Sequence, residues 1–438
     1  MGNTPNIRFK GFTDDWEQRK FGDVLVSLQN NTLSRADLSN ESGVAKNVHY
    51  GDVLIKFGEV LDVGKEQLPM ITDERVLSKY KASFLQNGDV IVADTAEDST
   101  VGKCSEIVGL NGDIVLSGLH TIPYRPVEKF ATGYLGYYLN SGAYHNQLIP
   151  LMQGIKVTSV SKSAMQDTDI VYPKSVKEQA MIGNCFQSLD HLITLHQRKC
   201  DETKKLKKFM LQKMFPKKDE KKPEIRFADF TDDWEQRKLG WLVDNDVIEA
   251  PKDGNHGEKH PTSDEYVEEG IPFLMASDIR NGRVDLENCK YITKERAEQL
   301  DKGFAREGDV LLTHKATIGE VAILEGLQEE YAMLTPQVTY YRILDNKRLS
   351  QKYLYAVFHS ESFQNEMQTK AAQSTRPYIG ISAQQNLTIS LPCSTEEQQR
   401  IGEYFASLDT LITLHQRKCD EIKEIKKFML QNMFPQKG

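Results

Sequence analysis

The sequence lacks the short motifs that bind nucleotides or S-adenosylmethionine. It contains neither GxGxxG nor the Asn/Asp-Pro-Pro-Tyr motif of amino-group methyltransferases, and Gly102-Lys103 is followed by Cys104 where a phosphate-binding loop requires Ser or Thr. We therefore expect a chain that is not an enzyme on its own and that binds no cofactor or metal itself.

Cysteine is scarce, and long apolar runs are absent. The six cysteines include no CxxC pair, which argues against a disulfide framework and against a zinc site. No run of about 18 apolar residues occurs, and the N-terminal residues form no apolar signal-peptide core. These absences predict a cytoplasmic protein with no membrane contact.

Positive charge is also in deficit. The formal net charge is −8 and the pI is about 5.8, which argues against a free-standing, nonspecific nucleic-acid binder with a basic tail. A local basic face remains compatible with this balance. With 438 residues, 39% of them hydrophobic and 27% charged, the chain is long enough for two globular cores.

What the sequence does contain is a repeat. FTDDWEQRK occupies Phe12 to Lys20 and returns 218 residues later, and LITLHQRKCDE occupies Leu192 to Glu202 and returns 219 residues later. Solenoid repeats have periods of about 20 to 50 residues, so this period indicates two duplicated domains instead. The residues between the repeated blocks differ almost everywhere, which predicts two similar frames around different inserts.

The repeat divides the chain into six segments. Two variable stretches are rich in short β-type runs, such as Asp89-Val-Ile-Val92 and Thr121-Ile-Pro-Tyr124, with Gly and Pro between them. We expect an α/β (α+β) fold. The predicted segments are an N-terminal arm (1–20), a first domain (21–174), a central helix (175–222), a repeated arm (223–238), a second domain (239–393) and a C-terminal helix (394–438).

Each variable stretch is followed by a long helical pattern. Ile182, Phe186, Leu189, Ile193 and His196 recur at steps of three and four, and Pro216 ends the pattern. A helix of this length needs a partner for its apolar stripe, and the other copy is the simplest one. The two helices should then form an antiparallel coiled coil that joins the domains with pseudo-twofold symmetry, as in a dumbbell. The alternative is that each helix packs only on its own domain.

A weaker correspondence exists inside the variable stretches. Asn87-Gly-Asp-Val-Ile-Val92 matches Glu307-Gly-Asp-Val-Leu-Leu312, and each is followed by a polar loop that ends in glycine, at Gly102 and Gly319. A constant scaffold with differing loops is typical of recognition modules.

The arrangement resembles the specificity subunit of type I restriction-modification enzymes. The resemblance rests on the duplicated arm, on Pro…Glu-Gln at each helix start (Glu178-Gln179 and Glu397-Gln398) and on Leu-Gln-x-Met-Phe-Pro at each helix end (Leu211 to Pro216 and Leu430 to Pro435). It implies two target-recognition domains that each read one half of a split double-stranded DNA target. It also implies methyltransferase partners, expected to be two, and restriction/translocase partners, with S-adenosylmethionine, ATP and Mg on those subunits.

If the domains read DNA, Lys and Arg should contact phosphates, and Arg, Asn or Gln should contact base edges. The candidates in the first domain are Lys79, Lys103, Gln153, Lys156, Thr158, Ser159 and Lys162. Those in the second domain are Arg280, Asn281, Arg283, Lys315, Gln373, Arg376 and Tyr378. The candidates for partner docking on the helices are Leu192, Leu195, Leu411 and Leu414.

A rival interpretation is a two-headed coiled-coil adaptor whose domains bind protein or carbohydrate, which the acidic net charge favours slightly. His314-Lys315 and the carboxylate-rich stretch Asp264 to Glu269 also allow a nuclease or metal site, although such clusters are usually solvated loops. The DNA target sequence and the length of its spacer do not follow from the residues.

Overall fold

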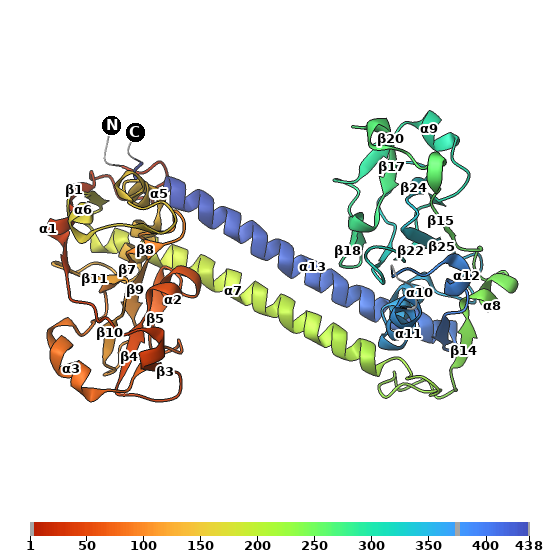
Figure 1. Cartoon of the computed structure of the whole chain (residues 1–438), viewed down its shortest axis with the longest axis horizontal. Helices are drawn as coiled ribbons and strands as arrows, with labels where there is room; N and C mark the ends of the chain where they lie inside the picture. The colour runs from red at the N-terminus through yellow and green to blue at the C-terminus, as the bar shows by residue number, and fades with distance from the viewer. Residues whose placement is uncertain (1–3, 373–376, 437–438) are drawn as a thin grey trace. The chain divides into compact units, whose positions relative to one another are not determined.

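A computed structural model describes residues 4–372 and 377–436. The chain forms two compact units: Met1–His196 with Arg417–Gly438, and Gln197–Gln416. Each unit contains one globular domain of mixed sheets and short helices, together with segments of the two long helices α7 and α13 (Figure 1). The predicted α/β (α+β) class and the internal duplication are confirmed.

The first domain is built on two sheets. The five-stranded sheet has the order β2 (Leu25–Ser27), β11 (Thr121–Pro126), β7 (Val90–Ala93), β9 (Cys104–Val108), β5 (Val60–Asp62). The four-stranded sheet has the order β10 (Val115–Ser117), β4 (Ala45–Val48), β6 (Met70–Ile71), β3 (Leu38–Ser39). The β-type runs predicted at Asp89 to Val92 and Thr121 to Tyr124 are thus neighbours, since β7 and β11 pair with Thr121 opposite Ala93.

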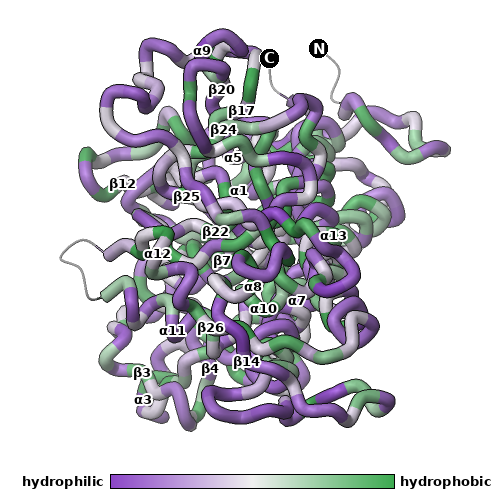
Figure 2. The backbone as a smooth tube through the Cα atoms, turned by 90° about the vertical axis from the view of Figure 1, so that its right-hand side faces the viewer, coloured by the Kyte–Doolittle hydropathy of each residue, from purple (hydrophilic) through white to green (hydrophobic). Residues whose placement is uncertain are grey.

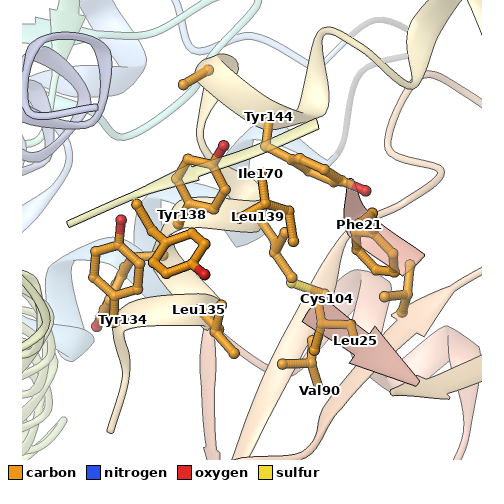
Figure 3. Packing of buried hydrophobic residues seen from close by; sticks show 14 of the residues in the cluster. Phe21, Leu25, Val90, Cys104, Tyr134, Leu135, Tyr138, Leu139, Tyr144 and Ile170 are labelled. Carbon is orange, nitrogen blue, oxygen red and sulfur yellow. The ribbon is translucent and has the colours of Figure 1, made fainter. Parts of the chain in front are cut away.

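Short elements complete the first domain. Two more pairs are β1 (Glu17–Lys20) with β13 (Asp169–Tyr172) and β8 (Thr95–Ala96) with β12 (Thr158–Ser159). The helices are α1 (Phe21–Val24), α2 (Tyr50–Ile55), α3 (Glu74–Tyr80), α4 (Tyr134–Asn140), α5 (Gly142–His145) and α6 (Lys162–Gln166). Figure 3 shows the core between them, in which Tyr144 lies beside Phe21 and Tyr138 lies beside Tyr134.

The second domain is also built on a four-stranded and a five-stranded sheet, but their strand orders differ from those of the first domain. The four-stranded sheet has the order β15 (Lys252–Asp253), β25 (Val338–Tyr341), β22 (Val310–Thr313), β23 (Val321–Ile323). The five-stranded sheet has the order β16 (Tyr266–Val267), β20 (Lys290–Ile292), β17 (Ile271–Leu274), β24 (Ala332–Leu334), β21 (Phe304–Ala305). Two further pairs are β14 (Glu235–Lys238) with β26 (Thr388–Leu391) and β18 (Ile279–Arg280) with β19 (Arg283–Val284). The short helices are α8 (Leu239–Asp244), α9 (Lys294–Glu298), α10 (Gln351–Phe358), α11 (Glu361–Ala371) and α12 (Ile381–Gln384).

The Gly-Asp correspondence has a structural cause. Asp89 accepts a hydrogen bond from the backbone N–H of Gln86 and pairs with Arg125 at 2.6 Å. In the second domain Asp309 accepts from the N–H of Arg306 and pairs with Arg342 at 2.7 Å. In both domains the buried carboxylate closes the turn before the strand. An arginine neutralises it, from the adjacent strand β11 in the first domain and from the residue just after the adjacent strand β25 in the second.

The Glu-Gln signature anchors the arm to the start of each long helix. α7 runs over Val176–Lys213 and α13 over Thr395–Asn432. Buried Glu178 accepts from Arg8 (Nε to Oε1, 2.6 Å) and from Trp16 Nε1 (3.3 Å), and Glu397 accepts from Arg226 at 2.6 Å and Trp234 at 3.2 Å. The charge-assisted bidentate pairing explains why arm and helix start are repeated together.

The Met-Phe-Pro endings pack into the opposite copy. Phe215, just after α7, lies in the second domain's core against Trp234, Tyr353 and Phe405. Phe434, just after α13, belongs to the first domain's core. Each helix therefore begins on its own domain and ends in the core of the other, so the alternative that each packs only on its own domain is wrong.

The two helices are antiparallel within each unit. In the first unit, Cys419 Sγ contacts the carbonyl of Ile193 at 3.8 Å and Lys426 pairs with Asp190 at 2.7 Å. In the second, Cys200 Sγ contacts the carbonyl of Ile412 at 3.7 Å, and Lys207 pairs with Asp409 at 2.6 Å. Because α13 runs forward as α7 runs backward through these contacts, the predicted antiparallel pairing is confirmed.

Apolar residues gather within the elements, whereas the connecting loops are largely hydrophilic (Figure 2). Over the residues that the structure describes, no helix combines the length and apolar character needed to cross a bilayer.

Candidate nucleic-acid interface

Two polar loops of the first domain meet at the end of β7. β8, in the loop after β7, pairs with β12, and the N–H of Val160 donates to the carbonyl of Asp94 at 2.9 Å. A third segment joins them, because the N–H of Asp94 donates to the carbonyl of His120 at 3.1 Å. We call this place the first loop junction, formed by residues 94–96, 120 and 158–160.

The second domain builds the same junction from matching backbone bonds. The N–H of Ile379 donates to the carbonyl of His314 at 3.0 Å, and the N–H of His314 donates to the carbonyl of Gln337 at 2.9 Å. Lys315 and Tyr378 face each other across an isolated bridge. The second loop junction is thus formed by residues 314–316, 337 and 378–379. The loop correspondence predicted from the sequence reflects one shared backbone scaffold.

Four of the predicted DNA-binding residues of the first domain lie together at or beside the first loop junction. Gln153 and Ser159 exchange backbone hydrogen bonds of 3.0 and 2.8 Å and close a hairpin that exposes Lys156. The Thr158 hydroxyl donates to the carbonyl of Asp98 at 3.0 Å, so it joins the hairpin to the loop after β8. Gln153, Lys156 and Ser159 therefore remain available to a ligand.

The remaining first-domain candidates lie elsewhere or are engaged. Lys103 Nζ donates to the carbonyl of Leu54 at 2.8 Å, and burial lowers the pKa of its ammonium group. Lys162 Nζ donates to the carbonyl of Leu28 at 3.3 Å. Lys79 is exposed on α3, with its ammonium group 5.1 Å from the ring centre of Tyr80. Of these three, only Lys79 is exposed.

In the second domain, Arg280 and Arg283 occupy a tight hairpin. Asn281 (φ 54°) and Gly282 (φ 78°) form the two-residue turn between β18 and β19, as expected for Asn-Gly. Arg280 lies directly opposite Arg283, and both side chains are exposed. Like charges in directly opposed positions destabilise a strand pair, so this placement favours an anionic ligand.

Lys315 and Tyr378 are both exposed at the second junction, and Tyr378 retains 49% of its accessible surface. Gln373 and Arg376 lie outside the described residues. The DNA contacts of these candidates stay predictions.

Replacing Arg280 and Arg283 together by alanine should weaken binding to all DNA sequences similarly. Two lost phosphate contacts should reduce the slope of log K against log [salt] by about 2. Titration of labelled duplexes at several salt concentrations measures the slope. Lys205→Ala, an exposed substitution on α7, is the control and should leave it nearly unchanged. Loss confined to one base of the target would instead make one of the arginines a base reader.

Sequence reasoning missed residues at the first junction. His120 is exposed. Its φ of 56° is rare for a residue other than glycine. Its Nδ1 lies 3.5 Å from Asp94 Oδ1, and its ring centre lies 5.3 Å from that of Tyr50. Thr95 Oγ1 donates to Asp94 Oδ1 at 2.8 Å. No sequence motif marks this group, because its members come from separate segments.

Two of the residues considered for a nuclease or metal site, His314 and Glu265, make structural contacts. His314 Nδ1 lies 2.9 Å from the carbonyl of Ile379, and burial lowers the pKa of its imidazole. Glu265 accepts from the N–H of Thr262 at 2.8 Å and pairs with Arg296. Among the described residues, no group of three or more His, Cys, Asp or Glu side chains could hold a metal ion.

The duplication is also visible in comparison with known proteins. A family model described as "Type I restriction modification DNA specificity domain" matches residues 13–205 and again residues 231–424. The chain belongs to this type I DNA specificity family. The chain thus carries two copies of a domain that the family model describes as a DNA specificity domain. This result favours DNA over the adaptor interpretation.

Two relatives carry names that agree with this assignment. The type I restriction enzyme MjaVIII specificity subunit of Methanocaldococcus jannaschii is 25% identical over 288 residues, covering 63% of this chain and 63% of that protein. The chain thus spans just under two thirds of that relative. The MjaX specificity subunit of the same organism is 23% identical over 436 residues, covering 94% of this chain and 91% of that protein.

The S subunit of a type I restriction-modification system from M. genitalium has a similar fold. Its crystal structure gives a TM-score of 0.61 at 12% identity, covering 99% of this chain and all of that one. A second structure, from work on assembly of the type I R-M system, gives 0.52 at 20% identity, covering 96% of this chain and 97% of that one. At these identities the likeness supports the fold alone.

Each long helix carries an exposed apolar stripe in addition to the side that contacts the other helix. The stripes are formed by Leu192, Leu195, Leu206 and Phe209 on α7 and by Leu411, Leu414, Ile425 and Phe428 on α13. All except half-buried Leu195 are exposed, from 39% for Leu192 to 55% for Phe428. Sequence reasoning named Leu192, Leu195, Leu411 and Leu414 and missed the other four.

The globular domains leave these stripes uncovered because they pack on the opposite flank of the helices. Tyr137 donates to Asp190 at 2.6 Å and Tyr355 donates to Asp409 at 2.9 Å. Leu192 lies roughly 200° around α7 from Asp190, at ~100° per residue. When two antiparallel helices are related by a pseudo-twofold axis, residues at equivalent positions of the repeat lie on the same face of the helix pair. The first unit thus presents Leu192, Leu195, Ile425 and Phe428 as one apolar surface, and the second presents Leu206, Phe209, Leu411 and Leu414.

Proposed function

We propose that this subunit reads a bipartite double-stranded DNA target, with each domain contacting one half-site. The observation that carries the proposal is the loop junction, which is built twice from matching backbone bonds but presents different side chains in the two copies. Because direct readout depends on the side chains that reach base edges, one scaffold with two sets of side chains suits two different half-sites.

The subunit has no catalytic activity of its own. Methyl transfer and cleavage belong to methyltransferase and restriction/translocase partners, which supply the sites for S-adenosylmethionine, ATP and Mg. The complex works in the cytoplasm, where the DNA is accessible. The absence of the corresponding motifs from this sequence supports this division of labour.

Two methyltransferases dock on the subunit, one on each apolar surface of the helices. Exposed leucine and phenylalanine side chains on a helical face mark protein interaction sites, because their exposure to water is unfavourable. The surface with Leu192 and Phe428 and the surface with Leu411 and Phe209 carry equivalent residues of the repeat. Two equivalent surfaces therefore accept two copies of one partner.

Native mass measurement of the complex purified from co-expression tests this function. We expect two methyltransferases per subunit, and methylated adenines in DNA exposed to the complex should define two short sequences separated by a fixed spacer. The subunit purified alone should neither methylate nor cut DNA. A complex that contains only one methyltransferase would contradict the docking model, and methylation without a bipartite sequence would contradict the readout model.

A further inference from the structure

The two loop junctions hold different side chains at positions that their backbone bonds make equivalent. The bond from Val160 to Asp94 corresponds to that from Ile379 to His314, and the bond from Asp94 to His120 corresponds to that from His314 to Gln337. Position 94 therefore corresponds to 314, position 95 to 315, and position 120 to 337. The first copy carries Asp, Thr and His at these positions, and the second carries His, Lys and Gln.

His120 occupies its place at a conformational cost. A non-glycine residue with φ of 56° lies in the left-handed region, and such strain persists chiefly at functional sites. The imidazole is 48% exposed, so burial in the core does not repay this cost. Its neighbours Asp94 and Tyr50 come from two other segments and hold the ring beside the junction.

The charge at the first junction points to base contact rather than phosphate contact. The half-buried Asp94 carboxylate would repel the DNA backbone, but carboxylates accept hydrogen bonds from the N4 amino group of cytosine in the major groove. The second junction presents the donor ammonium group of exposed Lys315 and the amide of half-buried Gln337, which both donates and accepts. Lysine pairs with the acceptors of guanine, and glutamine pairs with adenine.

We propose that Asp94 and His120 read one base pair of the half-site bound by the first domain, through an acceptor on Asp94 that selects an amino group on the base. Lys315 and Gln337 read the corresponding base pair of the other half-site, which presents an acceptor or an adenine edge. This assignment rests on the proposed DNA-reading function and adds to it the specificity-determining positions and the chemical class of base that each selects.

Selection of duplexes from a pool with randomised half-site positions tests the assignment. The full-length subunit, co-expressed with its methyltransferase partners, captures the duplexes, which are then sequenced. Asp94→Asn, which is nearly isosteric, should reduce the preference for the wild-type base at one position of one half-site by roughly tenfold to a hundredfold. His120→Gly should relax the same position. Lys315→Ala, a variant at the junction of the second domain, should relax a position in the other half-site only.

The readouts separate this proposal from a purely structural role. Glycine adopts positive φ without strain, so His120→Gly should unfold at a temperature no lower than the wild type while its specificity changes. An unchanged base preference in both Asp94→Asn and His120→Gly would overturn the assignment, and so would a change in both half-sites from one variant. Failure of the proposed function would look different, because the wild type itself would then enrich no bipartite sequence.

Discussion

Replacing Leu192 and Phe428 together by arginine is expected to release one of two methyltransferases from the complex. Both side chains belong to the apolar surface of the first unit, and they are 39% and 55% exposed. A partner that covers such a side chain gains roughly 1 to 2 kcal/mol from its remaining exposed area, and a buried guanidinium would add a desolvation cost. The combined loss of about 3 to 5 kcal/mol weakens the association at least a hundredfold. Native mass spectra of the purified complex provide the measurement.

Two further variants make this experiment specific. Leu411→Arg with Phe209→Arg alters the equivalent surface of the second unit and should also leave a complex with one methyltransferase. Leu344→Arg is the control, because Leu344 is 56% exposed but belongs to neither long helix. Since all the altered side chains are exposed, the unfolding temperature should change little. Retention of both methyltransferases by the double variants would show that the helices do not carry the docking sites.

The long helices could be predicted because their signals are local. Ile182 and Phe186 recur at helical spacing and are buried at 2% and 0% exposure. The Glu-Gln and Met-Phe-Pro signatures were recognisable as family features, although their contacts were not. Glu178 holds an arm 170 residues away through Arg8, and Phe434 packs into a core formed by the other copy. Contacts between such distant segments depend on the folded topology, which a local pattern does not reveal.

The candidate site was predictable at the level of loops but not of side chains. The Gly-Asp correspondence identified the loops that follow β7 and β22, and both contribute to a junction. The sequence could not show that the amine of Lys103 is bonded to the carbonyl of Leu54, or that His120 has a positive φ. Similarly, helical spacing predicts the apolar pattern through Ile182 and Phe186 but not the second stripe, with Phe209 and Phe428, that the domains leave exposed.

Exchange of the second domain is expected to change one half of the DNA target completely. The exchange replaces residues 239–393 by the equivalent stretch of a relative, and Tyr353 and Tyr355 are retained because they contact Phe215 and Asp409. The anchor of Trp234 and Arg226 on Glu397 lies outside the exchanged stretch and stays intact. Each mismatched base pair costs about 1 to 3 kcal/mol, roughly additively, so a domain that reads several different bases should reject the original half-site almost entirely.

Genome-wide mapping of methylated adenines in cells that carry the exchanged subunit and its methyltransferase tests the central claim most directly. The reciprocal exchange of residues 21–174, with Tyr134, Tyr137 and Tyr138 retained for their contacts with Phe434 and Asp190, is the matched control. The account predicts that each exchange changes one half-site and leaves the other half-site intact. A change in both half-sites, or in neither, from an active complex would contradict the assignment of one domain to each half of the target.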